Sequence, residues 1–261
     1  MKRGGALRSG IRDLGPVVPL PWLPLSLVVR PRAGYLVVIL GAPGVGKSTV
    51  GIQWAYSIVD RPVLVCSLDT DLASQAIRVR AMLEDRSTAS VEDEIESRPE
   101  GWDRFFETVR PQVRWSHVPM SADDLDELIV AETEFLGETP ALVVVDVVGD
   151  LTRKEALEDY SESFKSLHRT ARRRKTVVVA LHHLRRGQAA SGAVKFALDE
   201  GLYSGERGAE VVLGLWQPSP STVIVSVLKN RMGRADRRGD LNYAFAADLS
   251  RARIGRTEVG R

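Results

Sequence analysis

One stretch of the chain, residues 35–52, constrains its fold more than any other. It reads Tyr-Leu-Val-Val-Ile-Leu-Gly-Ala-Pro-Gly-Val-Gly-Lys-Ser-Thr-Val-Gly-Ile, an apolar run followed by a glycine-rich turn and a helix start. Residues 41–48 fill the pattern G-x-x-x-x-G-K-[ST]. Glycines let backbone N–H groups turn inward around a phosphate, and the positive end of the following helix faces the same point. The stretch therefore predicts a loop that binds the phosphates of a nucleoside triphosphate.

The polar residues of this loop have distinct expected roles. Lys47 is expected to reach the β- and γ-phosphates, and Ser48 to place its hydroxyl on Mg²⁺, which prefers oxygen ligands. A chance glycine-rich turn is the alternative, but the preceding strand and the following helix that the motif requires are both present. The expected nucleotide-binding residues are Gly41, Ala42, Pro43, Gly44, Val45, Gly46, Lys47, Ser48 and Thr49.

The length and composition of the chain indicate one α/β domain. A chain of 261 residues with 44% hydrophobic content can bury a sizeable core, and α/β folds of this length commonly form one domain. The single cysteine, Cys66, excludes a disulfide framework and a cysteine zinc site, so a cytoplasmic protein is expected. Prolines interrupt the apolar run near the N-terminus and no apolar run of about 18 residues follows, so no membrane segment is expected.

Charge is distributed unevenly along the chain. Residues 66–162 carry 24 acidic and 9 basic side chains, whereas residues 163–261 carry 19 basic and 8 acidic ones. The C-terminal third is therefore the expected face for a polyanion. An arginine-rich solvated surface explains the same charges equally well, so both interpretations stay open at this point.

Two further apolar strands end in carboxylates. The run 63–68 leads into Asp69, and the run 141–145 leads into Asp146. Parallel α/β sheets place their chemistry at the carboxyl ends of such strands. Asp146 has the form of the second nucleotide-binding motif, in which an acid holds a water on Mg²⁺. Asp71, which directly precedes a helical pattern, is expected to cap that helix, and Asp69 is the candidate for catalysis.

A later apolar strand, 176–181, runs into His182 and His183. Because neighbouring side chains of a strand point to opposite sides, the two imidazoles make a poor shared metal site. A polar side chain at that strand end is instead placed to sense the γ-phosphate. A long glycine-rich segment follows, and three strands in antiparallel succession are expected after it, at 210–216, 222–228 and 241–245.

The remaining stretches set the expected boundaries. Residues 1–33 are rich in proline and have little periodicity, which indicates an extended arm rather than a core element. The acidic stretch 84–100 lacks an apolar stripe and indicates a surface excursion. Ser121, followed by acidic residues, indicates the start of a capped helix. The predicted division is an arm at 1–33, a single domain at 34–254 and a tail at 255–261.

Taken together, these stretches resemble the RecA-like ATPase domain of the DnaB-type replicative helicases, a group of RecA/RadA-like P-loop ATPases. The resemblance implies a mostly parallel, twisted α/β sheet with helices on both faces and antiparallel C-terminal strands. It rests on segments that occur in the family's order, at 41–48, 65–69, 143–146, 180–186, 208–213 and 229–233.

The resemblance also implies roles for residues outside the glycine loop. Asp69 corresponds to the acid that polarises the attacking water, although the family usually has the longer Glu there. His183 corresponds to a Gln that senses the γ-phosphate, and a histidine, unlike that amide, titrates near neutrality. Lys229 and Arg231 correspond to a basic pair that reaches the nucleotide of the neighbouring subunit and stabilises transferred charge.

The activity that the resemblance implies is ATP hydrolysis at the subunit interfaces of a homo-oligomeric ring or filament on single-stranded DNA. Its cofactors are ATP and Mg²⁺, and replication or recombination proteins are its expected partners. The basic residues expected to lie near the DNA backbone are Arg153, Lys154, Arg185, Arg186, Lys195 and Arg207.

Other functions remain open on sequence grounds. Replicative helicases carry an N-terminal domain before the ATPase, and here roughly 30 residues precede the first strand, which departs from the family and leaves a stripped phage-type helicase as one expectation. A RecA/RadA-like recombination or strand-annealing ATPase is one alternative. A nucleotide-dependent assembly or loader module is another, and the short Asp69 favours it. A small-molecule kinase is disfavoured, because the pair Lys229 and Arg231 indicates chemistry between subunits.

Overall fold

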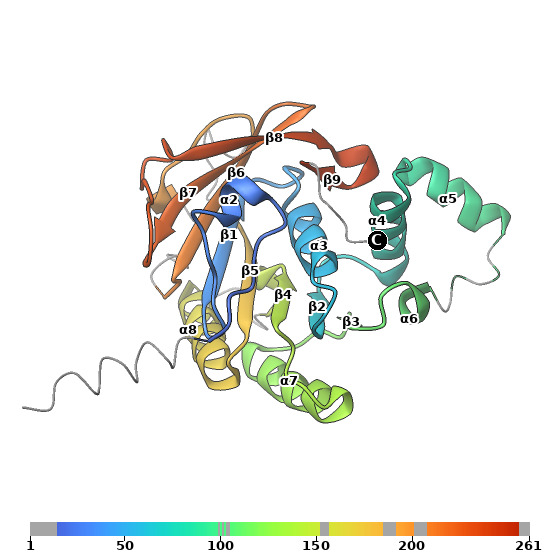
Figure 1. Cartoon of the computed structure of the whole chain (residues 1–261), viewed down its shortest axis with the longest axis horizontal. Helices are drawn as coiled ribbons and strands as arrows, with labels where there is room; N and C mark the ends of the chain where they lie inside the picture. Colours follow the sequence, from blue (N-terminus) through green and yellow to red (C-terminus); the bar gives the residue numbers. More distant parts are fainter. Residues whose placement is uncertain are drawn as a thin grey trace, which may run out of the picture.

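A nine-stranded sheet organises the chain in the computed structural model (Figure 1). The structure describes residues 15–98, 100, 102, 105–151, 157–184, 192–200 and 208–255. The spatial order of the strands is β3-β2-β4-β5-β1-β6-β7-β8-β9. Their bounds are Leu36–Gly41 for β1, Val63–Ser67 for β2, Val113–Ser116 for β3, Leu142–Asp146 for β4, Val177–His183 for β5, Val211–Ser219 for β6, Thr222–Asn230 for β7, Asn242–Asp248 for β8 and Arg253–Ile254 for β9.

The strands from β3 to β6 run parallel, and the strands from β6 to β9 run antiparallel. The antiparallel succession expected for the last three strands is confirmed, because β6 pairs antiparallel with β7 and β7 with β8, while β6 also pairs in parallel with β1. The central strands β1, β2 and β4 are buried along their whole length. Their continuous apolar runs follow from this burial, since a parallel sheet is covered on both faces.

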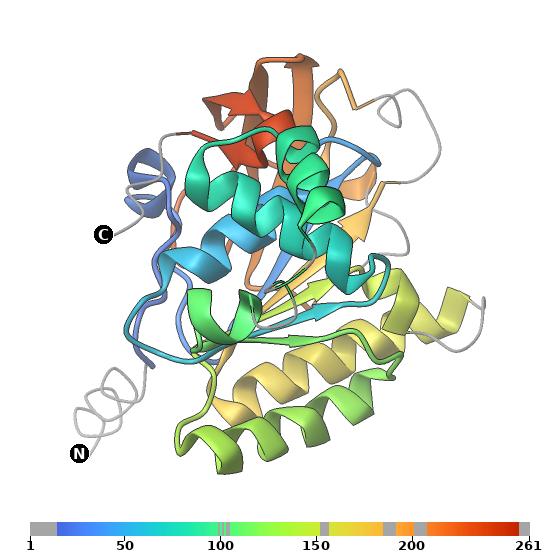
Figure 2. The ribbon, with the colours of Figure 1, turned by 90° about the vertical axis from the view of Figure 1, so that its right-hand side faces the viewer.

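Helices cover both faces of the sheet. Figure 2 shows α7 and α8 on one face and α3, α4 and α5 on the other, and two separate apolar clusters fill the two layers. No helix within the described residues combines the length and apolarity needed to cross a membrane. The helix bounds are Leu23–Ser26 for α2, Lys47–Ser57 for α3, Leu72–Glu84 for α4, Thr88–Ser97 for α5, Phe105–Val109 for α6, Ala122–Leu136 for α7 and Leu157–Arg174 for α8.

Local capping chemistry starts two of these helices as the sequence predicts. The side chain of Asp71 accepts a hydrogen bond from the backbone N–H of Ser74 at 2.9 Å and caps α4. At α7, Ser121 and Asp124 form a reciprocal capping box. Each cap satisfies backbone donors that have no partner inside the helix.

Within the stretch 84–100, which was expected to be a surface excursion, residues Thr88–Ser97 form α5, and Val91 is the one buried residue of that helix. Ser87 caps this helix, and charge pairs attach it to α4. Nitrogens of Arg80 and Arg86 each lie 2.6 Å from an oxygen of Glu94. The helix therefore docks mainly through ion pairs, and an apolar stripe gives no indication of such a contact.

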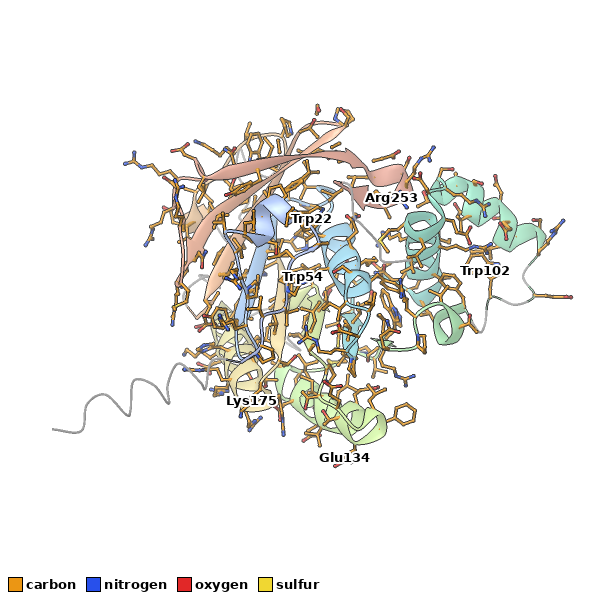
Figure 3. All side chains as sticks on the ribbon, viewed as in Figure 1. Trp22, Trp54, Trp102, Glu134, Lys175 and Arg253 are labelled. Atoms are coloured by element: carbon orange, nitrogen blue, oxygen red, sulfur yellow. The ribbon has the colours of Figure 1, made fainter. Side chains whose placement is uncertain are left out.

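The described N-terminal residues 15–33 also differ from the expected arm outside the core. Val18, Leu20, Trp22, Leu25 and Val29 are buried in the apolar cluster of their own chain. Figure 3 shows Trp22 beside α3, the helix that carries Trp54. The prolines remove helical or strand periodicity from this segment without removing its apolar content, so periodicity alone was misleading.

Candidate nucleotide-binding site

The glycine loop lies between β1 and α3 and requires glycine at two positions. Gly44 and Gly46 have φ angles of 79° and 95°, in the left-handed region that side chains disfavour. A Cβ atom on Gly46 would also lie 3.0 Å from Ile254 and 3.1 Å from Leu249. Because α3 begins at Lys47, the unpaired N–H groups of its first turn belong to the loop's end. The loop therefore has the backbone conformation of an anion cradle.

The side chain of Lys47 is held inside this loop. Its Nζ atom donates to the carbonyl oxygens of Gly41 and Ala42, at 2.9 and 2.8 Å. Burial lowers the pKa of Lys47 to about 8, and the nearby carboxylates of Asp146 and Asp69 oppose that shift. A buried ammonium with weak neutral partners gains strongly from an incoming anion, which is the property that a phosphate site needs.

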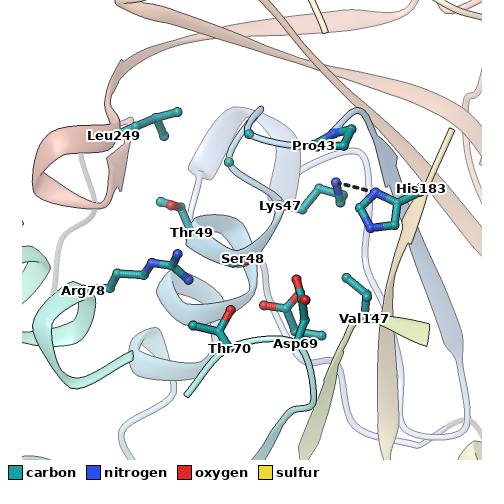
Figure 4. A pocket seen from close by; sticks show the side chains of 13 residues that line it. Pro43, Lys47, Ser48, Thr49, Asp69, Thr70, Arg78, Val147, His183 and Leu249 are labelled. Atoms are coloured by element: carbon teal, nitrogen blue, oxygen red, sulfur yellow. Dashed lines mark hydrogen bonds between the residues drawn. The ribbon is translucent and has the colours of Figure 1, made fainter. Parts of the chain in front are cut away.

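A pocket brings most of the predicted residues together (Figure 4). The loop and α3 supply one wall, the ends of β2, β4 and β5 supply the floor, and α4 and the turn after β8 close the other side. Its lining consists of Pro43, Gly44, Gly46, Lys47, Ser48, Thr49, Asp69, Thr70, Arg78, Asp146, Val147, His183 and Leu249.

Asp146 ends β4 at the base of the pocket and is 5% exposed. Burial raises its pKa, whereas a hydrogen bond from Ser48 and the charges of Lys47 and Arg78 lower it. The hydroxyl of Ser48 thus meets the carboxylate of Asp146 where the sequence predicts an Mg²⁺ site. No group of three His, Cys, Asp or Glu side chains that could hold a metal by itself occurs in the described ranges. The donor set suits Mg²⁺, which binds through few protein oxygens, waters and phosphates.

The turn that carries Asp69 is fixed to the end of β4. The backbone N–H of Leu68 donates to the carbonyl of Asp146 at 2.7 Å. Ser67 donates to the carbonyl of Thr70 at 2.9 Å and accepts from the side chain of Gln75 at 2.8 Å. Asp69 itself is exposed and lines the pocket, so its carboxylate is accessible to water and to a bound phosphate.

The two histidines at the end of β5 point to opposite faces, as the strand period predicts. His182 is buried and packs edge-on against Phe164, with ring centroids 5.0 Å apart. His183 enters the pocket, where its Nδ1 lies 3.5 Å from Nζ of Lys47 (Figure 4). Burial and the charge of Lys47 lower the pKa of His183, against the opposing charge of Asp69. The ring is therefore held neutral at physiological pH.

Sequence reasoning missed four pocket residues: Thr70, Arg78, Val147 and Leu249. Figure 4 shows Arg78 reaching from α4 toward Ser48. Arg78 follows Gln75 by one helical turn, and Gln75 is bonded to the Asp69 turn, so this face of α4 looks into the site. The sequence alone does not identify that face, because several nearby arginines could equally well have faced the pocket. Only the way in which α4 packs against the site distinguishes Arg78 from them.

Lys229 and Arg231 lie near the end of the sheet at which β1 starts, whereas the pocket lies at the end at which β1 finishes. Asn230, between them, pairs with Val211, which in turn pairs with Val37 of β1. Val37 precedes the loop residue Gly41 by four positions, or about 13 Å along the strand. Neither basic residue lines the pocket of its own chain.

Of the residues expected near DNA, only Lys195 falls in the described part of the chain, where its ammonium pairs with Asp240. The others lie outside the described residues: Arg153, Lys154, Arg185, Arg186 and Arg207.

Comparisons with known proteins agree with this geometry. A family model described as an AAA domain matches residues 24–189. A solved structure of an ATPase domain is similar with a TM-score of 0.76 and 16% sequence identity, over 97% of this chain and 96% of that one. A DnaB-like replicative helicase, studied for its interactions with primase, is similar with a TM-score of 0.78 and 16% identity, over 97% and 67% of the chains. A comparison with curated proteins gave no match. The predicted RecA-like fold is thereby confirmed.

Proposed function

Because this chain belongs to the AAA-domain family, we propose that it is a P-loop ATPase that hydrolyses ATP between neighbouring copies while bound to single-stranded DNA. The pocket that gathers Lys47, Ser48 and Asp146 carries this proposal. The proposal requires a second copy, because Lys229 and Arg231 lie at the opposite end of the strands from the pocket of their own chain. They are the two cations expected to act on the nucleotide of a neighbouring copy.

Binding starts with an exchange of partners at Lys47. In the described structure its ammonium donates to two loop carbonyls, which a triphosphate replaces with charged oxygens. Arg78 adds a second cation from α4, on the other side of Ser48. Charge-assisted hydrogen bonds are roughly twice as strong as neutral ones, so both exchanges favour the bound state.

Ser48 and Asp146 would hold Mg²⁺, as their hydrogen bond at the base of the pocket supports. The bound cation would neutralise charge on the phosphates that Lys47 also contacts. Its small protein donor set leaves room for waters and phosphate oxygens.

Asp69 and His183 are the residues for the hydrolytic step. The exposed carboxylate of Asp69 accepts a hydrogen bond from the attacking water and orients it. Nζ of Lys47 has only protons to give, so Nδ1 of His183 accepts and Nε2 carries the ring proton. That Nε2–H is the group with which His183 senses the γ-phosphate.

Lys229 and Arg231 complete the site from a second copy. Lys229 lies in β7, and Arg231 directly follows Asn230, the last residue of that strand, so the two cations lie close together in the chain. A cation that arrives from another copy stabilises the charge of phosphoryl transfer only when the copies assemble. Assembly and turnover are therefore coupled.

Single-stranded DNA is the proposed activator. The excess of basic residues in 163–261 supports contact with its phosphate backbone. Such contacts release counterions, so DNA stimulation of turnover is expected to fall steeply as salt rises.

The test is ATP turnover with and without single-stranded DNA, for the native chain, Arg231→Ala, Lys47→Ala and mixtures of the two variants. Each variant alone is expected to be inactive. In mixtures, an intact pocket from Arg231→Ala meets an intact Arg231 from Lys47→Ala, so turnover recovers. A mixture as inactive as its parts contradicts shared sites.

A second function, nucleotide-driven assembly without unwinding, is favoured by one observation. Asp69 is one methylene shorter than the Glu that this position usually carries, which favours slow hydrolysis. Assembly on ATP with no response to DNA supports this alternative. Strand pairing without unwinding indicates a recombination or annealing ATPase instead.

A further inference from the structure

A buried carboxylate, Glu210, lies directly before β6. It is at the start of that strand, whereas the nucleotide pocket lies at the other end of the parallel strands. Glu210 is 7% exposed. Its Oε2 accepts a hydrogen bond from the backbone N–H of Leu36 at 2.9 Å, and its Oε1 lies 2.9 Å from Nε2 of His168. Because an ionised carboxylate only accepts, Nε2 of His168 carries the proton of that bond. Both oxygens of Glu210 are therefore fixed by their neighbours.

Arg231 is tied to this carboxylate in two ways. Its backbone N–H donates to the carbonyl oxygen of Glu210 at 3.0 Å, and its guanidinium lies 3.7 Å from Oε1. That second distance is an ionic contact and exceeds hydrogen-bond length. The Arg231 side chain is 50% exposed. The charge of Glu210 thus attracts the guanidinium of Arg231 without forming a hydrogen bond to it. The N–H donors of the guanidinium therefore stay available for an incoming anion.

A second arginine, Arg32, acts on Tyr35 together with Arg231 and Glu210. Burial raises the pKa of Tyr35, the charges of Arg32 and Arg231 lower it, and the charge of Glu210 raises it. Both arginines and Glu210 thus act on the same phenol, where the negative charge of Glu210 opposes the two positive charges.

We propose that Glu210 is a positioning residue that orients Arg231 for a nucleotide held by a second copy of this chain. The inference rests on the proposed function and adds a residue with no contact to its own nucleotide pocket. Long arginine side chains lose rotamer freedom when they bind, and a fixed carboxylate reduces that loss by restricting Arg231 beforehand.

The geometry also explains why Glu210, the residue that holds Arg231, lies at the start of β6. Leu36, bonded to Glu210, is the first residue of β1, and β1 ends at Gly41 in the phosphate loop. Strand β1 thus connects Glu210, which holds the Arg231 that acts on a neighbouring copy, to the phosphate loop, which binds this copy's own nucleotide. In a repeating assembly each copy then carries donor and acceptor at a fixed separation.

The variant that tests this inference is Glu210→Gln, which keeps the shape of the side chain, removes its charge and replaces one of its two acceptor oxygens with an NH2 donor. Steady-state turnover of the full chain is expected to fall about tenfold to a hundredfold, the effect of a misplaced catalytic group. The fall is expected in kcat, with KM and ATP binding by the variant's own pocket unchanged. The matched control is Arg234→Ala, an exposed arginine on the same turn, which is expected to keep native turnover.

Mixtures separate positioning from a structural role. Glu210→Gln mixed with Lys47→Ala is expected to recover turnover, because the second variant donates a correctly held Arg231. Glu210→Gln mixed with Arg231→Ala is expected to show no turnover above that of Glu210→Gln alone, because both chains are defective donors. Recovery in this last mixture, or a native kcat for Glu210→Gln, overturns the inference.

The outcomes also distinguish the inference from the proposed function beneath it. If Arg231→Ala fails to recover with Lys47→Ala, the shared site itself is wrong. If that pair recovers and Glu210→Gln has higher turnover than the native chain, Glu210 restrains Arg231 instead of orienting it. Glu210→Asp retains the charge and replaces Glu210→Gln in every mixture if the latter has a lowered Tm. Its expected kcat lies between those of the native chain and Glu210→Gln.

Discussion

Nζ of Lys47 lies 3.5 Å from Nδ1 of His183 while it donates to two carbonyls of its own loop. Gly41, at the start of that loop, is paired with His183 in the register of β1 and β5. The ends of two neighbouring strands therefore hold one ammonium. Burial lowers its pKa to about 8, so the cation is close to losing its proton until an anion arrives.

The first prediction concerns proton uptake on nucleotide binding. Phosphate charge raises the pKa of Lys47 above its free value of about 8, so the complex holds more protons than the free chain above that pH. Binding is expected to take up a proton at about pH 8.5, and affinity to fall as the pH rises through this window. Calorimetric titration in two buffers of different ionisation enthalpy measures the uptake.

Lys47→Ala supplies the control for that measurement. The variant lacks the titrating ammonium, so any residual binding at the same pH is expected to proceed without this uptake. Near pH 6.5, free and bound Lys47 are both protonated, and its contribution disappears from the native chain as well. Equal uptake by the native chain and by Lys47→Ala contradicts the assignment.

The second prediction concerns Arg78, the cation that lines the pocket from α4. Arg78→Ala is expected to reduce kcat/KM for ATP by about tenfold to a hundredfold, because one charge-assisted contact to the phosphates is lost. Thermal unfolding of the free chain is expected to change little, since Arg78 is only partly buried.

Arg80→Ala is the matched control on the same helix. Arg80 pairs with Glu84 and Glu94 and stacks over Trp102, away from the pocket. Its loss is expected to loosen α5 and to leave kcat/KM close to native. A larger kinetic effect from Arg80→Ala than from Arg78→Ala contradicts the proposed role of Arg78.

The glycine loop and the strand-end carboxylates could be predicted because their chemistry is local. The spacing of Gly41, Gly46 and Lys47 fixes a loop conformation by itself, and Asp71 caps α4 through Ser74, which follows it within one helical turn. The alternation of His182 and His183 likewise follows from the strand period alone. Such features need no knowledge of what packs against them.

Arg78 and the anchor Glu210 could not be predicted, because contacts between distant segments define them. Glu210 meets Leu36 across 174 positions, and nothing in the sequence near either residue indicates the pairing. The core position of Trp22 has the same cause, since its partner Ile254 lies 232 positions away. Tertiary contacts overrode the local pattern in these cases.

The third prediction concerns the length of the side chain at position 69. Asp69→Asn removes the charge that orients the water and is expected to lower kcat by about a hundredfold, within the usual range for a general base. Asp69→Glu extends the carboxylate by one methylene and is expected to raise kcat, because the longer acid reaches further toward the attacking water. Single-turnover hydrolysis with saturating ATP measures both.

ATP binding provides the internal control for these two variants. Asp69 is exposed at the mouth of the pocket, so neither change is expected to alter the Tm by more than a few degrees. If Asp69→Asn hydrolyses ATP at the native rate, another group orients the water. In that case the assembly-module function becomes the better description of the chain.

The fourth prediction concerns the contact that joins the two ends of the described chain. Nε1 of Trp22 donates to the carbonyl of Ile254 at 2.5 Å, and Gln53 of α3 bonds the backbone of the same residue at 2.9 and 3.2 Å. The side chain of Ile254 also packs beside Gly46 of the phosphate loop, so closely that a Cβ atom on Gly46 would lie 3.0 Å from it. Trp22 therefore holds β9 against the helix that carries the nucleotide cradle.

Trp22→Phe removes one buried hydrogen bond and is expected to lower the free energy of unfolding by about 1 kcal/mol. Trp22→Ala also leaves a cavity, and a loss of about 3–5 kcal/mol is expected. Leu23→Ala is the matched control, because Leu23 is 71% exposed beside Trp22 and its loss is expected to stay within about 0.5 kcal/mol. Urea unfolding with and without ADP measures all three variants. The N-terminal segment supports the cradle if Trp22→Ala weakens ADP binding as well as folding, and an unchanged ADP affinity in the folded variant contradicts that link.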